Sequence, residues 1–148
     1  MSAFLPDVNV LIAFAWPSHV HHRLARAWFA RSAAAGWATC PFTQSGFVRI
    51  SSNPRIVDGA VTPREALALL RQMTEIGRHA FWPDDLDFTR PADVPTGLLV
   101  ERRQATDAYL LGLAIRRGGR LVTLDRSVAD LLPAASAHRG VIKVIPIT

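Results

Sequence analysis

Three aspartates stand at the ends of apolar segments, where carboxylates could do chemistry. Asp7 follows the short apolar segment Phe4-Leu5-Pro6, and Asp125 ends Arg120-Leu121-Val122-Thr123-Leu124. Asp107 lies near the start of a helical segment just before the second of these. If both segments are parallel strands, their carboxyl ends lie at the same edge of the sheet. The helix that contains Asp107 leads into the second strand, so it must start at this same edge and run back to the opposite one. The sequence therefore predicts one cleft containing Asp7, Asp107 and Asp125.

Three carboxylates held close together would repel one another and raise their pKa values unless a cation neutralised them. Ligands that are all oxygen atoms select a hard ion such as Mg²⁺ or Mn²⁺. In a basic protein, an ion held by carboxylates suits phosphodiester hydrolysis, because it activates water and stabilises charge on the phosphate oxygens.

A purely structural explanation exists for each aspartate. Asp7 and Asp107 could cap helices and interact with the helix dipoles, a very common use of aspartate. Asp125, before Arg126-Ser127, could be a turn residue. Taken singly, each is more often structural than catalytic. Jointly they favour a site, because all three fall on one predicted edge.

The overall composition predicts a basic, single-domain protein. The chain has 148 residues and a formal net charge of +5, which favours an anionic partner, either nucleic acid or an acidic protein. Cys40 is the only cysteine, so no intramolecular disulfide can form. The N-terminus lacks a basic region before its apolar residues, and no apolar segment reaches the roughly 20 residues of a membrane span. We therefore expect a cytoplasmic protein.

Predicted strands and helices alternate along the chain. Strands are expected at 4–6, 37–40, 79–82, 120–125 and 141–145, and helices at 8–16, 20–34, 44–50, 62–77 and 105–117. Thr62-Pro63-Arg64-Glu65 is the clearest helix start, with the pattern of a capping box. The third helix is expected to use Thr43 as its N-cap. Residues 83–97 contain three prolines and a glycine, which predicts a long irregular connection. This alternation predicts an α/β domain with a mostly parallel sheet of four to five strands flanked by helices.

Four short blocks, taken together in this order, resemble those of PIN-domain proteins. They are Asp7-Val8-Asn9, the stretch from Thr43 to Arg49, Ala105-Thr106-Asp107-Ala108 and Val122-Thr123-Leu124-Asp125. The chain length, the histidines at 19, 21 and 22, and the stretch from Phe42 to Pro54 are most similar to VapC toxins of bacterial toxin–antitoxin pairs. The resemblance covers nearly the whole chain and implies one PIN domain over residues 1–148.

The resemblance implies a Mg²⁺-dependent endoribonuclease, with Mn²⁺ as a possible substitute. It also implies inhibition by a VapB-type antitoxin, a homodimer, and products with a 5′-phosphate and a 3′-hydroxyl. Asp7, Asp107 and Asp125 would be the acidic metal ligands. Members of the family commonly have glutamate three residues after the threonine matched to Thr43, and this chain has Gly46. Many relatives have a further acid after the residue matched to Asp125, where this chain has Ser127. We therefore expect one ion.

Further residues are expected to support the site. Asn9 or Ser45 would complete the coordination of the ion together with water, and the scissile phosphate would lie near Thr43, Ser45 and Arg49. His19, His21 and His22 have no cysteine or acidic companion at zinc-ligand spacing, which favours a solvated helix start.

Two other functions are compatible with the sequence. The missing glutamate could have disabled catalysis, which would leave a protein that only binds RNA or its antitoxin. Alternatively, Asp7 could be a nucleophile that forms an aspartyl-phosphate. Against the second alternative, no aspartate follows Asp7 at the second position, and Lys143 is the only lysine.

Overall fold

The computed structural model describes residues 3–147, which form an α/β fold around one sheet. The strands of this sheet are β1 (Phe4–Pro6), β2 (Trp37–Thr39), β3 (His79–Phe81), β4 (Arg120–Thr123) and β5 (Ile142–Val144). All neighbouring strands pair in parallel, in the order β3-β2-β1-β4-β5. The predicted fold class is confirmed. Because β1 and β4 are central neighbours, with Pro6 paired to Val122, the residues that follow these two strands lie side by side.

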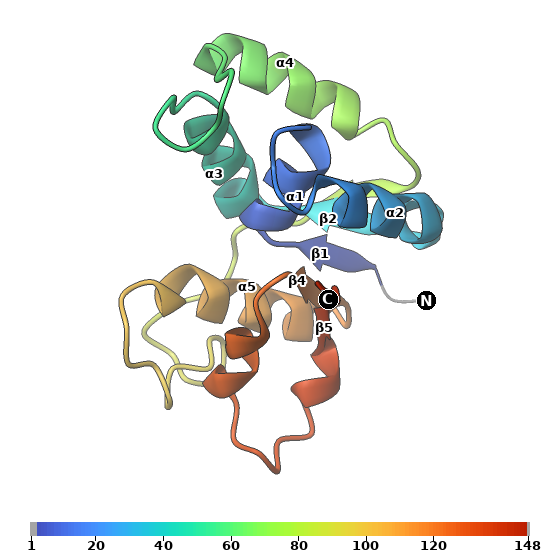
Figure 1. The fold of residues 1–148 in the computed structure, drawn as a ribbon. Helices are drawn as coiled ribbons and strands as arrows, with labels where there is room; N and C mark the ends of the chain where they lie inside the picture. Colours follow the sequence, from blue (N-terminus) through green and yellow to red (C-terminus); the bar gives the residue numbers. More distant parts are fainter. Residues whose placement is uncertain (1–2, 148) are drawn as a thin grey trace.

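Helices cover both faces of the sheet, as Figure 1 shows. The helices α1 (Val8–Ala15), α2 (His22–Ser32), α3 (Pro41–Ser51) and α4 (Pro63–Met73) lie on one side, and α5 (Gln104–Arg116) lies on the other. The described residues also include three short 3₁₀ segments: η1 (Ala33–Ala35), η2 (Arg126–Leu131) and η3 (Arg139–Val141).

The central strands are mostly buried because successive side chains enter different cores on the two faces of the sheet. Trp37 and Val122 belong to the core beneath α1 to α4, whereas their neighbours Ala38 and Leu121 belong to the core beneath α5. In the first core, Phe29 packs edge-to-face on Trp37 with a ring-centroid distance of 5.1 Å. Burial on both faces fixes the position of the central strands, and therefore of the edge where Asp7 and Asp125 emerge.

The predicted capping box of α4 is present. The Thr62 hydroxyl accepts a hydrogen bond from the Glu65 amide at 3.1 Å, and the Glu65 carboxylate accepts one from the Thr62 amide at 3.1 Å. Pro63 occupies the first turn. The local sequence therefore determines where this helix begins.

The predicted start of α3 was wrong. The helix begins at Pro41 with Cys40 as N-cap, and Thr43 is inside its first turn. The Thr43 hydroxyl accepts a hydrogen bond from the Cys40 amide at 3.0 Å and donates one to the Cys40 carbonyl at 3.1 Å. Thr43 thus takes the place that glutamate has in a capping box, and Pro41 supplies the helix start.

The segment between Trp82 and Arg103 consists of turns and extended stretches, in agreement with the irregular connection that its prolines predict. Within residues 3–147, no helix is long and apolar enough to cross a membrane.

Candidate carboxylate site

The structure places Asp7, Asp107 and Asp125 on the wall of one cavity of about 610 Å³. The first directly follows β1, the second lies in the first turn of α5, and the third closely follows β4. Three separate elements therefore bring carboxylates to the carboxyl edge of the sheet, as the topology argument anticipated.

Asp7 is a helix cap as well as a cavity residue. Its Oδ1 accepts a hydrogen bond from the Val10 amide at 2.9 Å, and its side chain is almost completely buried. Burial raises the pKa of the Asp7 carboxyl to about 6. Hydrogen bonds from the Thr123 hydroxyl and the Val10 amide oppose this rise, and the negative charge of Asp125 adds to it. Asp7 therefore does cap a helix, as the structural explanation proposed. The same side chain also lines the cavity, so a function in chemistry is still possible.

The pKa of the Asp107 carboxyl is raised further than that of Asp7. Burial, followed by the charges of Asp7 and Asp125, raises the pKa of its carboxyl to about 7. Such a shift means that the ionised form is disfavoured by its surroundings near neutral pH. A cation bound among the three carboxylates would relieve both the burial cost and the repulsion.

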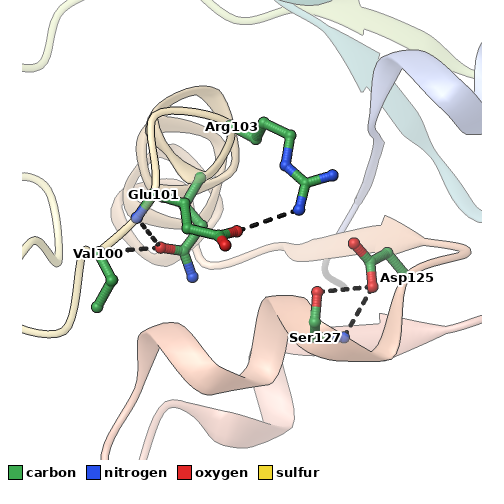
Figure 2. Close-up of polar contacts among 6 residues, drawn as sticks. Val100, Glu101, Arg103, Asp125 and Ser127 are labelled. Atoms are coloured by element: carbon green, nitrogen blue, oxygen red, sulfur yellow. Dashed lines mark hydrogen bonds and ion pairs between the residues drawn. The ribbon is translucent and has the colours of Figure 1, made fainter.

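Asp125 caps the segment η2. Its Oδ1 accepts two hydrogen bonds from Ser127, one from the amide at 2.9 Å and one from the hydroxyl at 2.7 Å. Figure 2 shows both bonds reaching the same carboxylate oxygen. Ser127 therefore fixes the orientation of Asp125, and among the described residues no hydrogen bond reaches its Oδ2.

Thr123, for which the sequence alone predicts no function, links two of the carboxylates. Its side chain is fully buried at the end of β4. The hydroxyl oxygen accepts a hydrogen bond from the Asp125 amide at 3.0 Å, and the hydroxyl group donates one to the Asp7 carboxylate. The available signal was a hydroxyl two residues before Asp125, directly after the apolar pair Leu121-Val122.

His19 also lines the cavity, which corrects the expectation that all three histidines are solvated. Its Nε2 is 3.0 Å from the Oδ1 of Asn9, another wall residue. Burial lowers the pKa of the His19 ring, and the nearby His21 and His22 lower it further. These effects favour the neutral ring, which contacts the Asn9 side chain.

The polar residues of the third helix that were predicted to support the site lie in different surroundings, and only one of them lines the cavity. Arg49 lines the cavity. Thr43 is fully buried with its hydroxyl engaged in the helix cap, so it cannot contact a phosphate as expected. Ser45 is exposed and is not part of the cavity wall. Of the four predicted supporting residues, only Asn9 and Arg49 line the cavity with the aspartates.

The glycine at position 46 has a steric explanation. A Cβ atom added to Gly46 would lie 2.6 Å from Cγ2 of Val8 on α1. Because α1 and α3 approach so closely here, a larger residue such as glutamate requires the Val8 side chain or one of the two helices to shift. The absence of the acid is therefore part of the packing of this protein.

The donor atoms on the cavity wall suit a hard divalent ion. The three carboxylates and the Asn9 amide offer oxygen ligands, which Mg²⁺ and Mn²⁺ prefer. Among residues 3–147, no three His, Cys, Asp or Glu side chains already form a group that could hold a metal ion. An ion at this edge would therefore take water as part of its coordination, as Mg²⁺ usually does.

The parallel sheet with acidic residues at its carboxyl edge agrees with the family match. The family model described as PIN domain matches residues 4–132, and the chain belongs to the PIN-domain family.

Three Mycobacterium tuberculosis proteins are similar over most of their length. Ribonuclease VapC39 is 45% identical over 145 residues, covering 98% of this chain and 100% of that protein. Ribonuclease VapC38 is 49% identical over 127 residues, covering 86% and 88%. Ribonuclease VapC29 is 42% identical over 144 residues, covering 97% of each. Within the PIN-domain family, the chain is of the VapC type.

Proposed function

We propose that the protein is a Mg²⁺-dependent endoribonuclease and the toxin of a VapBC-type toxin–antitoxin pair. The observation that carries the proposal is the single cavity shared by Asp7, Asp107 and Asp125, with raised pKa values for the first two. The ribonuclease names of the VapC relatives support RNA as the substrate. The net charge of +5 is consistent with an anionic substrate.

Asp7, Asp107 and Asp125 would hold the ion, with Mn²⁺ as a substitute for Mg²⁺. A bound divalent ion activates water and stabilises the charge of the phosphate in phosphodiester hydrolysis. Arg49 lines the same cavity and can donate charge-assisted hydrogen bonds to the scissile phosphate. Attack of water on phosphorus breaks the bond to the 3′ oxygen, which takes up a proton. The products carry a 5′-phosphate and a 3′-hydroxyl.

The other residues of the site position these groups. Thr123 connects the Asp7 carboxylate to the backbone of Asp125, and Ser127 fixes one oxygen of the Asp125 carboxylate. His19 holds the Asn9 amide at the cavity wall. We further propose that a VapB-type antitoxin inhibits the enzyme and that the functional unit is a homodimer.

The direct test is cleavage of total cellular RNA by the purified protein, freed of antitoxin, with Mg²⁺, Mn²⁺ or EDTA. We expect discrete fragments that require the ion and are absent with Asp7→Ala. Fragments that persist in EDTA and with Asp7→Ala would contradict the proposal. If RNA stays intact but still binds, the non-catalytic RNA- or antitoxin-binding alternative replaces it. Gly46, in place of the glutamate common in the family, would then explain the loss of catalysis.

A further inference from the structure

A second cavity, of about 640 Å³, adjoins two of the carboxylates. It lies between the residues around the start of α5 and the segment η2. Asp107 and Asp125 line both this cavity and the first one. The two cavities therefore meet at the acidic edge, and an RNA chain bound there could place one nucleotide in the second cavity.

The apolar part of the second cavity wall is unusually exposed. Leu98 and Val100 are 45% and 87% exposed although both are large apolar side chains. Val128 and Leu131 of η2 line the cavity as well. The volume is within the range of pockets that hold small molecules, which combine apolar walls with a few placed polar groups. The flat face of an unstacked nucleobase fits such a wall.

The polar groups around the start of α5 are ordered by their own contacts. The Gln104 side-chain oxygen accepts hydrogen bonds from the Val100 amide at 2.9 Å and the Glu101 amide at 2.8 Å. This leaves its amide nitrogen as a potential donor. The guanidinium of Arg103 pairs with the Glu101 carboxylate at 3.1 Å. Figure 2 shows Glu101 and Arg103 at the start of the helix, with Asp125 and Ser127 on the neighbouring segment.

The charged side chains that line the second cavity favour a nucleobase over a phosphate as its ligand. Four carboxylates line the second cavity, those of Glu101, Asp107, Asp125 and Asp130, and Arg103 is the only basic side chain among the described lining residues. Asp107 and Asp125 would be neutralised by the proposed ion, but Glu101 and Asp130 still outnumber Arg103, which disfavours a second phosphate here. A carboxylate readily accepts a hydrogen bond from an amino group of a base. Adenine, cytosine and guanine have such an amino group and uracil does not. The Arg103–Glu101 pair is exposed and therefore weak, so a base can displace it.

We propose that this second cavity is a specificity pocket for the nucleobase adjacent to the cleaved phosphodiester. Leu98 and Val100 contact the face of the base, and Glu101, with Arg103 and Gln104, recognises its edge. The pocket selects a base with an amino group over uracil. This inference rests on the proposed ribonuclease function and adds the residues that choose the cleavage position.

The test is sequencing of the RNA ends produced by wild type, Glu101→Gln and Arg103→Ala. Wild type should show enrichment of an amino-bearing base at one position flanking the cut. Glu101→Gln keeps the shape of the side chain but removes its charge, and should reduce that enrichment roughly fivefold or more. Arg102→Ala is the matched control, because Arg102 is exposed and does not line either cavity. Equal enrichment in wild type and both pocket variants, or uracil at both flanking positions, would overturn the proposal.

A second measurement separates the pocket from catalysis. Fluorescence anisotropy would measure the binding of labelled six-nucleotide RNAs, each of one base type, to wild type and Glu101→Gln in Ca²⁺ buffer. Tighter binding of amino-bearing RNAs, lost in Glu101→Gln, would support the pocket even if no RNA were cleaved, in which case only the nuclease proposal would fail. Equal binding of all four RNAs to both proteins would reject the pocket even in an active nuclease.

Discussion

At the scale of single residues, the carboxylates combine a structural and a chemical function. Asp7 caps α1 through the Val10 amide, and Asp125 caps η2 through Ser127. Both caps use Oδ1, and among the described residues no hydrogen bond reaches Oδ2 of Asp125. The arrangement costs stability, because burial and repulsion disfavour the ionised forms of Asp7 and Asp107.

Because the ionised Asp107 carboxylate destabilises the fold, we predict that Asp107→Asn stabilises the protein at pH 8 in EDTA. The pKa of Asp107 is about 7 in the folded protein and near its ordinary value of 3.8 in the unfolded chain. Between these values the folded state binds the proton more strongly, so stability falls as pH rises through this range. Asparagine has no charge to bury. We expect a gain of about 1–2 kcal/mol at pH 8, allowing for partial exposure, and little difference at pH 4.

Urea unfolding at both pH values checks this prediction, with the exposed Glu75→Gln as the charge-matched control. If Asp107→Asn were no more stable than wild type at pH 8, the ionised Asp107 carboxylate would not destabilise the folded protein.

Thr123 should be a positioning residue for the site. Thr123→Val keeps the volume of the side chain but removes the hydroxyl that contacts Asp7 and the Asp125 amide. Loss of such outer contacts typically reduces activity or metal affinity 10- to 100-fold, and we expect a reduction in RNA cleavage of roughly this size. Thr123→Ser should retain most of the activity. Comparable kcat/KM values for valine and wild type would show that the hydroxyl is dispensable.

At the scale of secondary-structure elements, the close packing of α1 on α3 decides what position 46 can hold. Alanine normally stabilises a helix by about 1 kcal/mol relative to glycine. Here Gly46→Ala should instead destabilise the protein by about 1–3 kcal/mol, because the new methyl group meets the stiff β-branched side chain of Val8.

Urea denaturation of Gly46→Ala, Val8→Ala and the double variant measures this contact. The double variant should lose less stability than the sum of the single variants. If Gly46→Ala were more stable than wild type, the two helices would have spare room, and the missing glutamate would need another explanation.

Most elements could be predicted from the sequence because their signals are local. The capping box at Thr62 identifies the start of α4, and the apolar runs at Leu5 and Val122 identify central strands. The start of α3 was misassigned because threonine can serve either as N-cap or, as at Thr43, inside the first turn. Only the backbone geometry of Cys40 and the position of Pro41 separate these two cases.

At the scale of the whole molecule, the strand order brings the site together. Asp7 and Asp125 emerge from β1 and β4, which are neighbours in the sheet although more than a hundred residues apart in sequence. The sequence predicts which residues follow the strands and that they share an edge. It does not predict the inclusion of His19, the exclusion of Ser45 or the bridging contact of Thr123, because these depend on how distant elements pack against one another.

The central claim is that Asp7, Asp107 and Asp125 form one site for a divalent ion. Titration of the protein with Mn²⁺, followed by electron paramagnetic resonance at pH 8, tests it most directly. We expect one ion per chain in wild type and at least about tenfold weaker binding in Asp7→Asn, Asp107→Asn and Asp125→Asn, with Glu75→Gln unchanged. Binding should weaken as pH falls through about 7 to 6, because Asp107 and then Asp7 take up protons. Unaltered Mn²⁺ affinity in all three aspartate variants would contradict the claim.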